Sequence, residues 1–254
     1  MRHWRDPERG RVVMNIAVLS DIHGNLEALQ AVIADMQEKN IGQVVCLGDL
    51  VGYGPDPESV VSEVRQRGYA AVCGNHEAAL AAEKARRTMN FQARENNIAT
   101  ASLLSEENLR YCCNLPRALS AAGALFVHGV PPDSVNRYIY MLEDSEISDI
   151  FSKNPCRLFF VGHTHQLAFF YERDQSVIRE HISAGSYRLE PERQYLINCG
   201  SVGQPRDGDR RAKYVIYGRG GNNLTVRAVD YDVETTVRKI IARGFPRAFA
   251  ERLR

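Results

Sequence analysis

The first half of the chain alternates short apolar runs with helical patterns, and this alternation restricts the fold more than any other feature. An apolar run at 16–20 precedes a helical pattern from about 26 to 39. A second run at 44–47 precedes a helix that we expect to begin at Asp56-Pro57-Glu58, and a third run covers 69–73. Strand–helix–strand units at this spacing predict parallel strands covered by helices.

The pattern changes further along the chain. From 78 to about 113 it is helical and rich in alanine, and a short helix is expected near 146–151 between apolar runs at 123–127 and 158–161. Beyond His165 the strand-like runs lie at 167–171, 176–180, 194–198, 213–217 and 224–229. Turn residues between these runs predict antiparallel pairing, and a final helix is expected from about Asp232. We therefore expect an α/β fold: a four-layer αββα sandwich of two stacked mixed β-sheets flanked by helices.

Length and composition fit one domain. A chain of 254 residues that is 44% hydrophobic can bury a full core, and we find no repeat or linker-like composition. We expect a single domain at 15–254 after a flexible N-terminal tail at 1–14, which is polar and basic and lacks the apolar stretch of a secretory signal. A targeting role for the tail and a start at Met14 both fit the sequence.

Charge and cysteine spacing narrow the function classes. With 32 basic and 31 acidic side chains, the chain has no basic excess of the kind that dedicated nucleic-acid binders carry. No apolar run approaches the about 18 residues that a membrane span needs, so we expect no membrane partner. The six cysteines include no C-x-x-C pair, which argues against a disulfide framework or a thiolate zinc site and for a cytoplasmic location.

Metal-capable side chains follow five successive expected strands. In chain order these are Asp21 and His23, then Asp49, then Asn75 and His76, then His128, and finally His163 and His165. Because ligands gather at the carboxyl ends of the strands in an open α/β sheet, we expect these side chains to meet. Each of them alone is commonly a helix cap, a turn residue or a hydrogen-bonded histidine, but their occurrence at five strand ends favours a metal site.

The donor types indicate which ions the site would take. Carboxylate, amide and imidazole groups without thiolates suit Mn, Fe, Zn, Ni or Co. The donors are more than one ion needs, so two divalent transition metal ions that share a bridging carboxylate fit better. Of these metals, manganese is the one that we expect the site to bind.

Five sequence blocks carry a resemblance to a known family. They are Asp21-x-His23, Gly48-Asp49, Gly74-Asn75-His76-Glu77, His128-Gly129 and Gly162-His163-Thr164-His165. Together they resemble the calcineurin-like metallophosphoesterase superfamily, in the family's order, and the stretch from Asn198 to Arg206 is similar to the small bacterial phosphoesterase and phosphodiesterase branch.

The resemblance implies a role for each residue. Asp21, His23 and His165 would bind the first metal, Asp49 would bridge, and Asn75, His128 and His163 would bind the second. His76 would be catalytic, stabilising the phosphoryl oxygens and protonating the leaving group. A metal-bound hydroxide would attack phosphorus in line with the departing oxygen, in a small phosphodiester or monoester that could be a nucleotide.

Arg206, Tyr53 and Arg137 are candidates for substrate contacts, and Tyr138 is a candidate for a lid together with Arg137. Arg206 lies in a polar turn and could bind a phosphate as a bidentate donor. Tyr53 could line the pocket, and Arg137 with Tyr138 could form a lid over the second metal. We interpret Glu77 as an acid at the start of the following helix.

Departures from the family pattern bear on the substrate. Cys199 stands where the branch usually has proline, Val130 stands where a second glycine is common, and the loop after Asp49 lacks the arginine of protein Ser/Thr phosphatases. These departures count against a phosphoprotein substrate.

Two alternatives to a small-molecule phosphoesterase stay open at this point. One is a catalytically silent scaffold of the same fold that binds a protein partner. The other is a nuclease of the same superfamily, against which the balanced charge counts. The sequence leaves the oligomeric state open.

Overall fold

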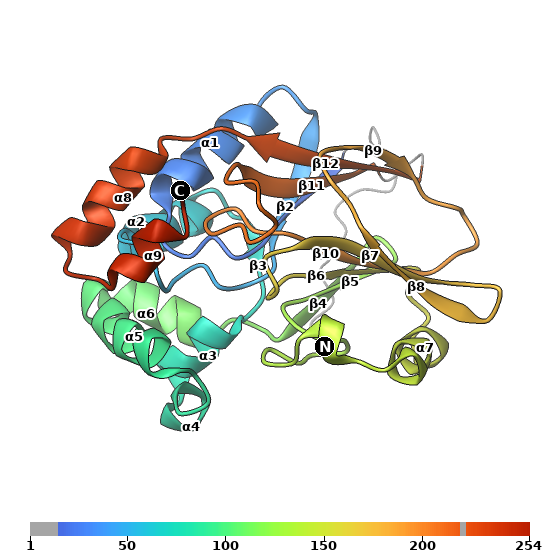
Figure 1. Ribbon diagram of the computed structural model, residues 1–254, viewed down its shortest axis with the longest axis horizontal. Helices are drawn as coiled ribbons and strands as arrows, with labels where there is room; N and C mark the ends of the chain where they lie inside the picture. The colour runs from blue at the N-terminus through green and yellow to red at the C-terminus, as the bar shows by residue number, and fades with distance from the viewer. Residues whose placement is uncertain (1–14, 219–221) are drawn as a thin grey trace.

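Two six-stranded sheets make up the centre of the computed structural model, which describes residues 15–218 and 222–254 (Figure 1). The tail expected at 1–14 lies outside the described residues. In spatial order the first sheet contains β3 (Ala70–Ala71), β2 (Ile41–Cys46), β1 (Asn15–Leu19), β11 (Ala212–Gly218), β12 (Asn223–Val229) and β9 (Gly185–Arg188). The second contains β4 (Ala118–Ala121), β5 (Ala124–Val127), β6 (Leu158–Val161), β10 (Tyr195–Cys199), β7 (Leu167–Arg173) and β8 (Ser176–His181).

Both sheets are mixed, as expected. In the first sheet β1, β2 and β3 are parallel, whereas β11 pairs antiparallel with β1. In the second sheet β5, β6 and β10 are parallel, and β4, β7 and β8 complete the sheet in antiparallel pairs. The predicted antiparallel pairing is confirmed among the strands after His165. One of them, β10, also runs parallel to β6, a strand that precedes His165, and this contact was not predicted.

Helices cover the outer faces of the two sheets (Figure 1). The helical segments of the described residues are α1 (Leu26–Met36), α2 (Pro57–Gln66), α3 (Asn75–Ala81), α4 (Glu83–Arg86), α5 (Phe91–Leu103), α6 (Glu106–Cys113), the 3₁₀ turn η1 (Ile139–Met141), α7 (Asp144–Lys153), α8 (Val233–Ala242) and α9 (Arg247–Glu251). The packing of α1, α2 and α6 on the first sheet and of α7 on the second gives the four-layer αββα sandwich.

Side-chain alternation along β1 explains the layers. Ile16 and Val18 face the second sheet and pack with Phe126 and Phe160 in the central core. Ala17 and Leu19 point the other way, into the core beneath the helices. Because both faces are covered, the strand is apolar from Ile16 to Leu19, and polar groups lie only at its ends.

The alanine-rich segment is divided into four helices, α3 to α6, which the continuous helical pattern did not predict. Ala82 is extended, with φ −147° and ψ 126°, and separates α3 from α4. The side chains of Asn90 and Ser105 then cap α5 and α6 by accepting hydrogen bonds from Ala93 N and Asn108 N. β4, β9 and α9 were also not expected.

Two helix starts were expected from capping residues. Asn25 caps α1, and its side-chain oxygen accepts from Ala28 N at 3.1 Å. Asp56 occupies the N-cap position of α2 but makes no side-chain cap bond. Its carboxylate instead accepts a hydrogen bond from Lys239 of α8 at 2.8 Å, which ties the last helices to the first sheet's cover.

Candidate metal centre

The metal-capable side chains meet at the ends of strands from both sheets. In the first sheet, the loops after β1 and β2 bring Asp21, His23 and Asp49, and the start of α3 after β3 brings Asn75 and His76. In the second sheet, the loops after β5 and β6 bring His128, His163 and His165. Apart from the half-buried Asn75, each of these side chains is buried. Burial of so many polar groups is costly unless they find charged or hydrogen-bonding partners.

Asp21 has one satisfied and one unsatisfied oxygen. Its Oδ2 accepts from Ser20 Oγ at 2.6 Å and from the backbone N–H of His163 at 2.9 Å. Its Oδ1 is buried without a hydrogen-bond partner, 3.3 Å from His165 Nε2 and 3.7 Å from His23 Nε2. Burial works against ionisation of Asp21, but the nearby His165 and His128 together outweigh it and the net pKa is lowered. The carboxylate thus presents one free anionic oxygen to the two imidazoles.

Backbone carbonyls orient three of the histidines. Leu47 O lies 2.8 Å from His128 Nδ1, Val51 O lies 3.1 Å from His23 Nδ1, and Gln204 O lies 2.6 Å from His165 Nδ1. Each carbonyl can only accept, so Nδ1 carries a proton, and in the neutral ring Nε2 presents its lone pair to the site.

The distance between two of these nitrogens tests whether a cation fits. His23 Nε2 and His165 Nε2 lie 3.1 Å apart, although the tautomers set by Val51 and Gln204 leave neither with a hydrogen. Burial, followed by the neighbouring His165, lowers the pKa of His23 well below its usual value, so a proton is disfavoured there. Two facing lone pairs beside the free Asp21 oxygen form a donor set that a divalent metal ion would satisfy.

A second donor group surrounds His128. Its Nε2 lies 3.1 Å from Asn75 Oδ1, 3.1 Å from His163 Nδ1 and 3.4 Å from Asp49 Oδ2. Burial would lower the pKa of His128, but the Asp49 carboxylate outweighs it and raises the pKa to about 9. Burial lowers the pKa of His163 to about 3, which keeps that ring neutral. The Asp49 carboxylate therefore favours a positive charge at this donor group.

Asp49 belongs to both groups. Its Oδ2 lies 3.4 Å from His128 Nε2 and 3.7 Å from His23 Nε2, while its Oδ1 accepts from the backbone N–H of His76 at 2.9 Å. The same carboxylate thus takes part in a donor cluster with His23 and in another with His128 and His163. This is the position that a bridging ligand would require.

His76 lies beside the donor groups. Its ring centroid is 5.0 Å from that of His23 and 4.6 Å from that of Tyr53, and its Nδ1 is buried without a hydrogen-bond partner. Asn97 fixes the backbone by donating to His76 O at 3.0 Å. Burial lowers the pKa of His76, against the opposing effect of Asp49, so the ring is neutral until an anion approaches it.

Glu77 has a role that its sequence position did not reveal. It lies in the first turn of α3, as expected, yet its carboxylate is fully buried. It accepts hydrogen bonds from the backbone N–H groups of Asp49 at 2.8 Å, Gly74 at 2.9 Å and Val51 at 3.2 Å. Glu77 therefore fixes the loop after β2 against the loop after β3. Glu77 lies three residues after Gly74, and this spacing was the sequence feature that could have indicated its hydrogen bond to the Gly74 backbone.

The three candidate substrate contacts occupy different positions. The Tyr53 ring packs at 4.6 Å from His23 and 4.9 Å from Phe249 of α9. Arg206 donates from its backbone to His165 O at 3.1 Å, and its guanidinium opposes the rise that burial causes in the Tyr53 pKa. Arg137 instead pairs with Glu146 at 2.8 Å on the surface, and its role in substrate binding stays a prediction.

Tyr138, the neighbour of Arg137, lies at the site. Its ring stacks on His163 with centroids 4.0 Å apart and an interplanar angle of 17°, and Tyr140 stacks on its other side at 5.1 Å. Tyr138 therefore covers one face of the His163 imidazole, a ring of the second donor group. Of the two residues predicted to form a lid, Tyr138 contacts His163 and Arg137 does not, and the lid itself stays a prediction.

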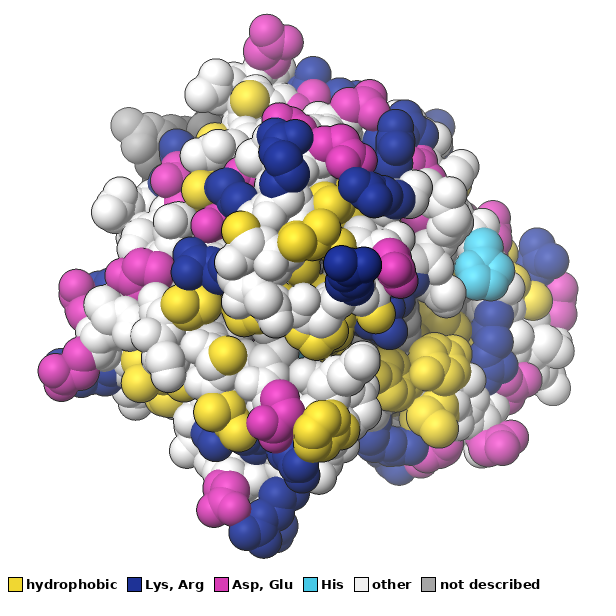
Figure 2. All heavy atoms as spheres, turned by 60° about the vertical axis from the view of Figure 1, so that its left-hand side comes forward, with side chains coloured by type: hydrophobic (Ala, Val, Ile, Leu, Met, Phe, Trp, Pro, Cys, Tyr) yellow, Lys and Arg dark blue, Asp and Glu magenta, His cyan; other side chains and the backbone are white. Residues whose placement is uncertain are grey.

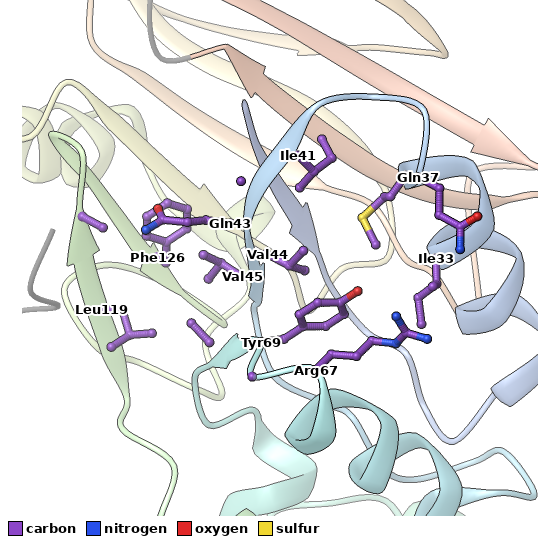
Figure 3. Close-up of a pocket in the computed structure, with 15 residues that line it drawn as sticks. Ile33, Gln37, Ile41, Gln43, Val44, Val45, Arg67, Tyr69, Leu119 and Phe126 are labelled. Carbon is purple, nitrogen blue, oxygen red and sulfur yellow. The ribbon is translucent and has the colours of Figure 1, made fainter. Parts of the chain in front are cut away.

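A separate apolar hollow of about 290 Å³ lies at the edge of the sandwich (Figure 3). It is lined by side chains of α1, β2, β4 and β5, among them Ile33, Val44, Leu119 and Phe126. Its described lining includes no histidine or acid, so it lacks the donors found at the strand ends.

Comparison with known proteins agrees with the fold. Residues 14–218 match the family model of the calcineurin-like phosphoesterase superfamily domain. An uncharacterized protein of Methanocaldococcus jannaschii is 33% identical over 94% of this chain and 96% of its own length. The crystal structure of a metallophosphoesterase from Sphaerobacter thermophilus has a TM-score of 0.82 and 32% identity over 95% of this chain and 98% of that one.

A further solved structure, a hypothetical protein from Pyrococcus horikoshii OT3, shares the fold with a TM-score of 0.76 at 18% identity over 94% of this chain and 97% of that chain. The chain belongs to the calcineurin-like phosphoesterase superfamily. Family and fold thus support hydrolysis of phosphoesters by a metal-dependent enzyme in general. Among the described residues no helix has the length and apolar character to cross a membrane.

Proposed function

We propose that the protein is a dinuclear-metal phosphoesterase that hydrolyses small phosphate esters. The observation that carries this proposal is the position of Asp49 Oδ2, which faces His23 at 3.7 Å and His128 at 3.4 Å. One carboxylate oxygen that serves two imidazole-rich donor groups is the arrangement of a bridged two-ion site.

The assignment of ligands follows the two donor groups. Asp21, His23 and His165 would hold one ion, Asn75, His128 and His163 would hold the other, and Asp49 would bridge. Manganese is our first choice because imidazole, amide and carboxylate donors without thiolate suit it. When bound, the ions would supply Lewis-acid stabilisation of phosphoryl oxygens and lower the pKa of a water molecule.

The chain's own residues would position and protonate the substrate. In the reaction, water adds to phosphorus, the ester P–O bond breaks, and the leaving oxygen takes a proton. His76 has a buried, unpartnered Nδ1 next to the donor groups, and a phosphate anion nearby would favour its protonated form. Its ring could then donate to a phosphoryl oxygen or to the leaving oxygen.

A metal-dependent assay tests this proposal. Purified protein would be stripped with EDTA, reloaded with Mn²⁺ and assayed on p-nitrophenyl phosphate and bis(p-nitrophenyl) phosphate. We expect hydrolysis that requires Mn²⁺ and that falls by about 10²–10⁴ in His76→Asn, with metal content retained. A wild-type protein that binds no metal and hydrolyses neither ester in Mn²⁺ would overturn the proposal.

Comparison of the two esters also addresses the class of substrate. Preference for bis(p-nitrophenyl) phosphate would assign a phosphodiesterase, and preference for the monoester would assign a phosphatase. Both results support the two-ion proposal, because attack on phosphorus and departure of an oxygen are common to both reactions.

A further inference from the structure

An arginine-lined cleft opens beside the candidate metal centre. It has a volume of about 670 Å³ and lies between the loop after β10 and the C-terminal end of α9. Arg206, Arg210, Arg252 and Arg254 line it, together with Asp209. Four guanidinium groups around one hollow form a candidate anion site, because guanidinium forks match phosphate oxygens.

Arg206 connects this cleft to the donor groups. Its backbone N–H donates to the carbonyl of His165 at 3.1 Å, and its Nη2 donates to Gln204 Oε1 at 3.0 Å. Its Nε is buried and has no hydrogen-bond partner. On the α9 side, Phe249 packs on Tyr53, whose ring contacts His23 and His76. Arg206 thus lines the cleft and also contacts the candidate metal ligand His165.

Asp209, the acidic residue that lines the cleft, does not neutralise the positive charge of the cleft arginines. Asp209 is held by Arg211 through contacts of 2.6 and 3.0 Å. Arg254 pairs with Glu234 at 2.8 Å, but Arg210 and Arg252 have no carboxylate within ion-pair distance among the residues that the structure describes. Both are exposed, and the buried Leu253 fixes the backbone between Arg252 and Arg254.

Among the described residues, the surface around the cleft does not form a continuous basic patch. Figure 2 shows Lys and Arg side chains interleaved with Asp and Glu over the face that carries α8 and α9. A mixed field of this kind gives little attraction at a distance, since opposite charges screen one another. Selective binding of an anion must then come from the converging arginines of the cleft.

We propose that this cleft receives the additional phosphate groups of a substrate whose reacting phosphate lies at the metal centre. The substrate class would be small organic molecules with two or more phosphate groups. This inference rests on the proposed phosphoesterase function, because the reacting phosphate is placed by that site. The cleft itself, however, can be tested without turnover.

The test is a calorimetric titration with inorganic tripolyphosphate, and with orthophosphate for comparison, in buffer that contains EDTA. The double variant Arg210→Ala/Arg252→Ala would be compared with wild type and with Arg173→Ala/Arg188→Ala, which removes two exposed arginines of β7 and β9. Circular dichroism would establish that each variant is folded.

We expect wild type to bind tripolyphosphate at least about tenfold more tightly than orthophosphate, and the cleft variant to lose about tenfold or more of that affinity. The control variant should retain it. Equal affinity for the two anions, an unchanged cleft variant, or an equal loss in the control would overturn the inference. Since EDTA prevents turnover, this result is independent of the assay for hydrolysis.

Discussion

The carboxylate of Glu77 accepts a hydrogen bond from the backbone N–H of Asp49 at 2.8 Å, with both side chains buried. Burial, and then the nearby Asp49, raise the pKa of Glu77 to about 7, so this contact holds two carboxyl groups together at an electrostatic cost. The cost is offset by the three backbone N–H groups that Glu77 satisfies, and by any cation that Asp49 binds.

Removal of Glu77 should therefore destabilise the loop that carries Asp49. We expect Glu77→Ala to lower the free energy of unfolding by about 2–3 kcal/mol or more, because three buried donors lose their acceptor. Glu77→Gln keeps one acceptor oxygen and should have an intermediate effect. Urea unfolding measures both, with the exposed Glu83→Gln as a control. An alanine variant as stable as wild type would contradict the role assigned to Glu77.

The two donor groups should be separable by mutation. Asp21→Ala removes the carboxylate that belongs to the first group alone and should mainly release the ion shared with His23 and His165. His128→Ala should mainly disturb the second ion, beside Asn75 and His163. Elemental analysis after gel filtration would measure the loss. The assignment would be wrong if both variants kept two metals and full activity.

Gly162 should not tolerate even one methyl group. A Cβ there would lie 1.8 Å from Ser20 Oγ and 2.6 Å from Asp21 Oδ2, so the Asp21 carboxylate would have to move. We expect Gly162→Ala to destabilise by about 1–3 kcal/mol and to lower metal affinity. Gly218→Ala is the matched control, because its nearest neighbour, Asn15 Oδ1, is 3.5 Å away. Similar melting temperatures and metal contents for the two variants would count against this packing.

An ion pair far from the metal centre gives a pH-dependent prediction. Arg227 donates two hydrogen bonds to Asp35, at 2.9 and 2.7 Å, and the pair lowers the Asp35 pKa. A lowered pKa stabilises the fold above the unfolded value of about 3.9 and loses that effect as pH falls through the folded value. Asp35→Asn should cost about 1 kcal/mol at pH 7.

Urea unfolding at pH 7 and below pH 4 measures this difference between wild type and Asp35→Asn. The difference should shrink as the pH falls. A constant difference across this range would show that Asp35 contributes through packing and not through its charge. Asp149→Asn, at an ion pair with 61% of the aspartate side chain exposed, should change little at either pH.

Much of the fold could be predicted from the sequence because β1, β2 and β6 are short apolar runs with helices or turns after them. The polar groups at strand ends stood out against these runs. The parallel pairing of β6 with β10 could not be predicted, since local turn chemistry says nothing about which distant strand lies alongside. The breaks in the alanine-rich segment depended on single residues such as Ala82, which carry no strong turn signal.

The candidate site also has features that could be predicted from the sequence and features that could not. The resemblance implied which side chains would share each ion, and the structure brings those groups together. The resemblance could not show that the backbone carbonyls of Val51, Leu47 and Gln204 orient the imidazoles. Every residue has a backbone carbonyl, so residue types do not indicate which ones act as acceptors. The stack of Tyr138 on His163 and the position of Arg206 likewise depend on tertiary packing.

The central claim is that Asp49 bridges two ions, and metal stoichiometry tests it most directly. Wild type and Asp49→Ala would be loaded with Mn²⁺, passed through gel filtration, and analysed for manganese per chain. We predict about two ions per wild-type chain and a loss at both positions in Asp49→Ala, because its Oδ2 faces His23 and His128. Wild type with one ion or none, or an alanine variant that keeps two, would contradict the bridged site.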